Sequence, residues 1–221
     1  KNSPILYSKH AADPEASVAG YLAMDQLGFT HPEYKVFVDE SFELDCVVSS
    51  IVVGDGDLEE YDVSGYGWDD FLDLCGARAA IGDGDIHPGN FVYEADEVFP
   101  IDFGEVKLPR DAVADITDGL YTEWYEELMQ SPELPDYSSR QDLAEDLVER
   151  TRRQAREIDT GSIETGLYTR GITSTPDLGF TDEKELEASD MRARGRLRMI
   201  ERAQDLEPED VDPWEMLSDR A

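Results

Sequence analysis

Three oxygen-bearing side chains are grouped in the middle of the sequence: Asp85, Asn90 and Asp102. Asp85 and Asn90 share one short segment, Gly-Asp-Ile-His-Pro-Gly-Asn, and Asp102 begins an Asp-Phe-Gly segment. A carboxylate can orient a hydroxyl group and accept its proton. An amide oxygen and a second carboxylate are ligands of the kind that Mg²⁺ prefers. Together the three groups predict phosphoryl transfer from a metal-bound nucleotide.

This chemistry requires a cation. Two carboxylates and a triphosphate repel one another in a site from which water is excluded, unless bound cations neutralise them. We therefore expect Mg²⁺ to be needed for ordered ATP binding as well as for the chemical step. Each residue alone is weak evidence, because 52 of the 221 residues are acidic and most single aspartates are solvated surface groups. The prediction rests on the joint spacing.

Segment 82–107 resembles the catalytic core of the aminoglycoside phosphotransferase and choline kinase-like group of the protein-kinase-like superfamily. That group has the pattern His-Gly-Asp-x-His-x-x-Asn, followed by Ile-Asp-Phe/Trp-Gly. The resemblance is close in this segment and loose elsewhere. This chain has Asp83 where the first histidine usually stands. We expect this departure to remove a group that supports the loop, and to leave the reacting groups in place.

The resemblance implies a role for each residue of the motif. Asp85 would be the catalytic aspartate, and His87 would support the loop that carries it. Asn90 and Asp102 would bind Mg²⁺, and Asp102 would bridge the metal to the β- and γ-phosphates. The alternative for His87 is an ordinary buried histidine.

Kinase folds also pair a strand lysine with a helix glutamate at the α- and β-phosphates. Lys9 ends a predicted strand and Glu15 begins the next predicted helix, so they are the candidates. The alternative is a surface lysine and a glutamate stabilised by the helix dipole. A later strand with Ser50 and Val52 would lead into a hinge whose backbone binds adenine. Only eight residues precede Lys9. We therefore expect that a glycine-rich phosphate loop either lies upstream of this sequence or does not exist.

Apolar periodicity and turn residues predict the elements around the motif. We expect helical stretches at 14–27, 68–80, 113–128, 139–158 and 182–203, strands at 4–9, 34–38, 44–53, 91–93 and 98–99, and loops at 54–57 and 160–180.

This order predicts an α+β, protein-kinase-like two-lobed fold. Residues 1–55 would form a reduced sheet lobe. Residues 56–221 would form a helical lobe with the catalytic loop (82–92), the Asp-Phe-Gly segment (101–107) and a helical tail.

The composition predicts the environment in which the protein works. The 52 acidic and 19 basic residues leave a formal net charge of −33. Because salt screens this self-repulsion, we expect a halophilic source, cellular or viral, and the alternative is an acidic protein of an ordinary cell. The charge argues against binding to nucleic acid or anionic membranes, and no apolar run is long enough to span a membrane. We expect a cytoplasmic protein or a virion component, with Cys46 and Cys75 reduced.

Arginines gather in two late segments. They are Arg150, Arg152, Arg153 and Arg156 in one, and Arg192, Arg194, Arg196, Arg198 and Arg202 in the other. One interpretation is pairing with nearby acids. The other is a docking face for an acidic protein partner.

Two functions are consistent with these patterns. The first is an ATP- and Mg²⁺-dependent phosphotransferase acting on a hydroxyl of a small molecule or protein, an acceptor that no motif identifies. The second is a catalytically degenerate kinase fold that serves as a binding or structural component of a larger assembly, a viral one included. The retained Asp85, Asn90 and Asp102 favour the first, and the arginine-bearing tail favours the second.

Overall fold

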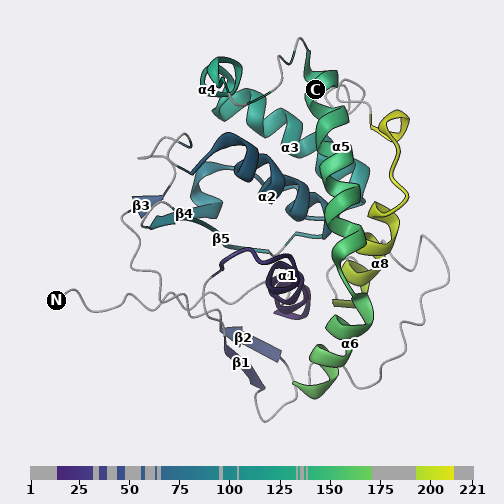
Figure 1. The fold of residues 1–221 in the computed structure, drawn as a ribbon. Coiled ribbons are helices and arrows are strands. Elements are labelled where there is room, and N and C mark those ends of the chain that lie inside the picture. Colours follow the sequence, from purple (N-terminus) through teal and green to yellow (C-terminus); the bar gives the residue numbers. More distant parts are fainter. Residues whose placement is uncertain are drawn as a thin grey trace, which may run out of the picture.

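The computed structural model describes residues 14–31, 35–38, 44–47, 56–57, 63, 66–94, 97–103, 105–132, 134, 137, 139–170 and 193–211. Within these ranges the chain is α+β, as predicted, and helices predominate (Figure 1). The α-helices are α1 (Pro14–Leu27), α2 (Trp68–Ala80), α3 (Pro109–Glu123), α4 (Tyr125–Gln130), α5 (Arg140–Glu157), α6 (Thr160–Thr169) and α8 (Ala193–Ala203). The strands are β1 (Lys35–Val38), β2 (Leu44–Val47), β3 (Gly56–Asp57), β4 (Phe91–Glu94) and β5 (Glu97–Pro100), and two short 3-10 turns are η2 (Pro88–Asn90) and η3 (Pro208–Asp210).

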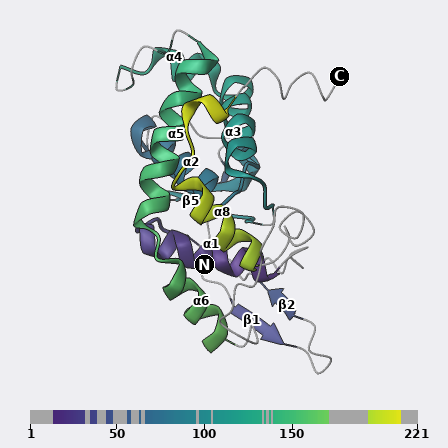
Figure 2. The same cartoon turned by 90° about the vertical axis from the view of Figure 1, so that its right-hand side faces the viewer.

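The described strands form two antiparallel sheets. One is the pair β1–β2, and the other has the order β3-β4-β5. In both views the β1–β2 pair lies on the opposite side of α1 from α2 (Figures 1 and 2). The prediction of a loop at 54–57 is wrong for its last two residues, because Gly56–Asp57 forms strand β3 and pairs with β4. Glycine and aspartate are poor strand formers, so only the pairing with β4 reveals this strand.

One hydrophobic core joins α1, α2, α3, α5, α6 and α8. In α2, Phe71 meets the rings of Phe91 and Trp124 at centroid distances of 5.2 and 5.4 Å. Phe103, the phenylalanine of the Asp-Phe-Gly segment, is fully buried and meets Tyr21 of α1 edge-on at 4.9 Å. Burying one such ring stabilises the fold by about 2 kcal/mol. The core therefore fixes the segment that carries Asp102.

The helix predictions hold for α1, α2 and α5, and Ser139 caps α5 by accepting a hydrogen bond from the Asp142 amide at 3.2 Å. The stretch predicted at 113–128 divides into α3 and α4, because Trp124 leaves helical geometry (φ −129°, ψ 21°). The loop predicted at 160–180 is wrong for Thr160–Thr169, which is α6. The predicted strand at 4–9 and residues 182–192 of the last predicted helix lie outside the described residues.

None of the helices in the described ranges combines the length and apolar character needed to cross a membrane. Cys75 of α2 is buried and carries a free thiol. Burial raises the pKa of this thiol to about 12, so it is an unreactive core residue at neutral pH.

Candidate functional site

The predicted catalytic loop connects α2 to β4 and is held at both ends by backbone hydrogen bonds. The Lys107 amide donates to the Gly82 carbonyl at 2.7 Å, and the Ile101 amide donates to the Asn90 carbonyl at 2.9 Å. Gly82 has φ 73°, and a Cβ there would lie 2.6 Å from the Lys107 carbonyl oxygen. Both ends of the loop are therefore joined to the segment that carries Asp102.

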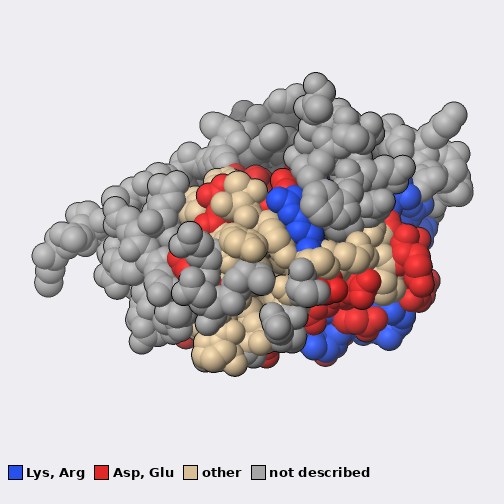
Figure 3. Space-filling view, turned by 90° about the horizontal axis from the view of Figure 1, so that it is seen from above, with Lys and Arg blue, Asp and Glu red and all other residues tan. Residues whose placement is uncertain are grey.

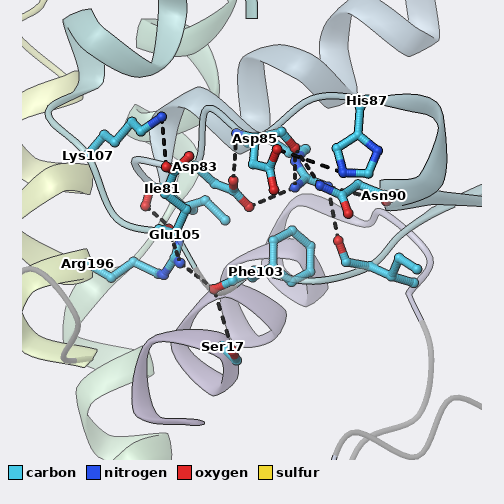
Figure 4. A network of polar contacts seen from close by, with 12 residues as sticks. Ser17, Ile81, Asp83, Asp85, His87, Asn90, Phe103, Glu105, Lys107 and Arg196 are labelled. Atoms are coloured by element: carbon cyan, nitrogen blue, oxygen red, sulfur yellow. Dashed lines mark hydrogen bonds and ion pairs between the residues drawn. The ribbon is translucent and has the colours of Figure 1, made fainter. Parts of the chain in front are cut away.

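Asp85 presents its carboxylate to solvent. Its side chain is 48% exposed, and Oδ1 lies 3.9 Å from Nε2 of His87. His87 is also exposed, which excludes the alternative of a buried histidine. Its Nδ1 accepts a hydrogen bond from the Gly89 amide at 3.1 Å, so the imidazole closes the turn between Asp85 and Asn90. The two side chains lie next to each other on the loop (Figure 4).

Asn90 is buried, with 4% of its surface exposed. Its Nδ2 donates to the Asp85 carbonyl oxygen at 2.9 Å. This bond engages the nitrogen of the side-chain amide and leaves the oxygen as the end that can bind a cation. The same bond ties the residue predicted to bind the metal to the residue predicted to act as base.

Asp102 follows directly after Ile101, whose amide is bonded to Asn90. It has φ 59° and is the one non-glycine with a positive φ in the described ranges. A side chain in this left-handed region costs on the order of 1 kcal/mol, and such strain is concentrated at functional sites. One hydrogen bond of the Asn90 side chain and one of its backbone thus connect Asp85, Asn90 and the residue before Asp102.

The structure does not test the predicted nucleotide contacts. Lys9, Ser50 and Val52 lie outside the described residues, and Glu15 lies in α1 although its side chain is not described. Their predicted roles stay predictions.

The donor set fits magnesium bound together with a nucleotide. In the described residues no group of three or more His, Cys, Asp or Glu side chains could hold a metal ion by itself. Mg²⁺ in nucleotide sites usually takes only one or two protein oxygens, and phosphates and water supply the rest. The Asn90 amide and the Asp102 carboxylate, the predicted ligands, would supply this number.

Sequence reasoning missed an ion pair beneath the loop. Arg78 of α2 and Asp83 are both fully buried, and Nη2 of Arg78 lies 2.9 Å from Oδ2 of Asp83. Burial raises the pKa of the Asp83 carboxyl, and the Arg78 guanidinium opposes this effect. Oδ1 of Asp83 accepts a hydrogen bond from the Asp85 amide at 3.1 Å. The expectation that Asp83 removes a group that supports the loop is therefore wrong, because the Asp83 carboxylate itself provides support.

Arg196 of α8 holds the segment after Asp102. This fully buried side chain donates to the carbonyls of Ile81, Phe103 and Glu105 at 2.7, 2.6 and 2.8 Å (Figure 4). Ser17 of α1 contacts the same Phe103 carbonyl, with its hydroxyl 3.5 Å from the oxygen (Figure 4). Two helices from opposite ends of the chain thus contact the Asp-Phe-Gly region.

Several other arginines pair with local acids, as the first interpretation of the clusters expects. Arg150 of α5 bonds Asp69, Asp73 and Asp146 and is nearly buried. Arg152 pairs with Glu149 and Glu207, Arg153 with Asp73, and Arg198 with Glu201. On the face seen in Figure 3, basic and acidic side chains lie next to one another. Docking of an acidic partner stays a prediction.

An open pocket of about 270 Å³ lies beside the predicted base. Its lining residues are Gly84, Asp85, Ile86, Glu105, Lys107, Asp115, Asp118, Gly119, Thr122 and Glu123. Lys107 is the one basic residue among them, and its Nζ lies 2.8 Å from Glu105 and 2.5 Å from Asp115. These contacts raise the pKa of Lys107 against the opposing effect of burial. The pocket is therefore predominantly acidic.

No family model matches this sequence, and no curated protein is similar to it. Among solved structures, the fold is similar to a chain of the Shewanella oneidensis MR-1 toxin–antitoxin complex of HipA, HipB and operator DNA. The TM-score is 0.42 at 14% sequence identity, and the alignment covers 92% of this chain and 58% of that chain.

Proposed function

We propose that this protein is an ATP- and Mg²⁺-dependent phosphotransferase with a protein-kinase-like fold. The observation that supports the proposal is the joining of Asp85, Asn90 and the residue before Asp102 by direct hydrogen bonds. The Asn90 side chain bonds the Asp85 carbonyl, and the Asn90 carbonyl bonds the Ile101 amide. A base and two oxygen ligands for a cation are the groups that phosphoryl transfer needs from a protein.

In this mechanism each residue has one task. Asp85, which lines the pocket, aligns the acceptor hydroxyl and accepts its proton as the phosphoryl group is transferred. The Asn90 amide oxygen and the Asp102 carboxylate would hold Mg²⁺, which would neutralise the charge of the nucleotide phosphates. The Gly89 amide and the His87 imidazole keep the intervening turn closed.

The acceptor would enter the pocket beside Asp85. Glu105, Asp115, Asp118 and Glu123 surround this pocket with carboxylates. Such a lining repels anionic acceptors and attracts those with positive charge. We propose an alcohol, free or on a protein side chain, that has a cationic group nearby.

The test is ATP turnover and Mg-ATP binding in multimolar KCl, comparing wild type with Asp85→Asn and Asp102→Asn. We expect Asp85→Asn to bind Mg-ATP and to lose about 10²- to 10⁴-fold in kcat, because the base is gone. Asp102→Asn should lose Mg²⁺-dependent binding, measured by titration calorimetry. The control Asp205→Asn removes one exposed carboxylate outside the site and should behave as wild type.

Two outcomes distinguish the alternatives. A folded wild type that neither binds nor hydrolyses Mg-ATP contradicts the proposal. A wild type that binds Mg-ATP without any turnover favours the degenerate kinase fold that serves as a binding component.

A further inference from the structure

We propose that Arg78, with Asp83, is the positioning residue that sets the relative placement of Asp85, Asn90 and Asp102; the inference rests on the proposed function of these residues. Its guanidinium contacts a backbone carbonyl at Asp85, at Asn90 and at Ile101, the residue before Asp102. Nη2 donates to the Asp85 carbonyl at 3.0 Å, and Nη1 lies 3.2 Å from the Ile101 carbonyl and 3.5 Å from the Asn90 carbonyl.

Asp83 completes the arrangement from the other side. One of its oxygens bonds Arg78, and the other accepts the Asp85 amide. The backbone of Asp85 is therefore held at its amide by Asp83 and at its carbonyl by Arg78. This leaves the Asp85 side chain free to face the pocket while its main chain is fixed.

The surroundings of Arg78 limit its movement. Its guanidinium carbon lies 5.2 Å from the ring centroids of both Phe91 and Phe103. Phe91 follows Asn90 directly, and Phe103 follows Asp102 directly. The two phenylalanines thus hold the guanidinium beside the metal-binding residues that precede them. A planar fork of donors suits several fixed acceptors, whereas a lysine ammonium on its flexible stem does not.

Stability alone does not explain this arrangement. Buried ion pairs contribute little net stability, because removing two charges from water offsets their attraction. A well-packed apolar pair of similar volume would serve the core equally well. The contacts to three site carbonyls give the charged pair a purpose that an apolar pair lacks.

The experiment compares two variants with a matched control. Arg78→Lys keeps the charge opposite Asp83 and loses the fork of donors. The double variant Arg78→Met, Asp83→Leu replaces the ion pair by two apolar side chains. Because both charges are removed, no unpaired charge is left in the core to cause misfolding. The control is Arg150→Lys, which alters an equally connected arginine that contacts Asp69, Asp73 and Asp146, away from the loop.

Two readouts are measured in high salt: hydrogen exchange at the amides of Asp85, Asn90 and Ile101, and kcat with KM for Mg-ATP. We expect Arg78→Lys and the double variant to exchange faster at these amides. We expect kcat to fall about 10²-fold, and by more than KM rises, because small displacements of reacting groups have effects of this size. Arg150→Lys should leave both readouts unchanged.

The inference is overturned if folded Arg78→Lys keeps wild-type exchange and kcat, or if Arg150→Lys loses as much as Arg78→Lys in both readouts. Failure of the proposed function is distinguishable, because the wild type would then not bind Mg-ATP. Hydrogen exchange still tests the inference in that case. Faster exchange at the loop amides of the Arg78 variants supports the positioning role, and unchanged exchange contradicts it.

Discussion

At the scale of single residues, the buried Asp83 holds the loop that carries Asp85. It stands where the catalytic loop that this sequence resembles has a histidine, and its buried carboxylate bonds both the Asp85 amide and Arg78. The loop of this chain is thus supported by a buried ion pair, whose arginine is supplied by α2 one turn before the loop begins.

Among the non-glycine residues that the structure describes, Asp102 has the most unusual backbone, at φ 59°. Alanine is strained in this left-handed region, whereas glycine is not. We expect Asp102→Gly to be more stable than Asp102→Ala by about 1 kcal/mol, the reverse of the usual order of these two residues. Urea unfolding of both variants in the same KCl buffer measures the difference. Equal stability, or a more stable alanine variant, would show that the backbone at Asp102 is not strained.

At the scale of elements, the loop depends on close contact with α3. A Cβ on Gly84 would lie 2.9 Å from Cα of Ala112, and one on Gly119 would lie 2.6 Å from Cγ2 of Ile86. Gly84 thus serves close packing between two backbones rather than a turn with positive φ. The α3 helix therefore determines how closely the loop lies against the core.

The α6 helix depends on its cap and its packing. The Asp159 carboxylate accepts the Gly161 and Ser162 amides at 3.0 and 3.2 Å, and the Asp159 backbone bonds the Gln26 side chain of α1. Asp159→Ala should reduce the free energy of unfolding by about 1 kcal/mol, because two amides lose their acceptor. Chemical denaturation measures the change. Ser162→Ala, an exposed substitution in the same turn, is the control and should be close to neutral, and a neutral Asp159→Ala would contradict the cap.

At the scale of the whole molecule, the net charge of −33 is the dominant property. The described arginines neutralise part of it locally, as Arg150 does among three aspartates. The remaining carboxylates repel one another, so we propose that the protein works in a salt-rich cytosol.

Salt should stabilise this fold. The Debye length falls from about 8 Å at 0.15 M to about 3 Å at 1 M, so repulsion between surface carboxylates weakens. We expect the melting temperature to rise as KCl increases from about 0.15 M to about 2 M, where the Debye length is shorter than about 3 Å. A neutral osmolyte at matched osmolality separates screening from general solute effects. The halophilic proposal is abandoned if stability is the same at low and high KCl.

Much of the fold follows from local patterns. The helices α1, α2 and α5 and the β4–β5 pair agree with the predicted elements, because apolar spacing, Ser139 and the turn residues act over a few positions. Gly56–Asp57 and Thr160–Thr169 differ because neither segment has strong intrinsic propensity. The first is a strand because β4 pairs with it, and the second is a helix because Ile163 and Leu167 are buried in the core.

The sequence by itself determined which groups are available for chemistry: Asp85, Asn90 and Asp102 are recognisable from residue type and short spacing. It also determined the acidic character of the protein, because charge is a sum over residues. Only the tertiary structure decided that Arg78 and Asp83 support the loop, that Arg196 and Ser17 meet at Phe103, and that acids surround the pocket at Asp85. These contacts join residues from different helices and strands, and the pairing of distant groups depends on how the core packs rather than on any local pattern.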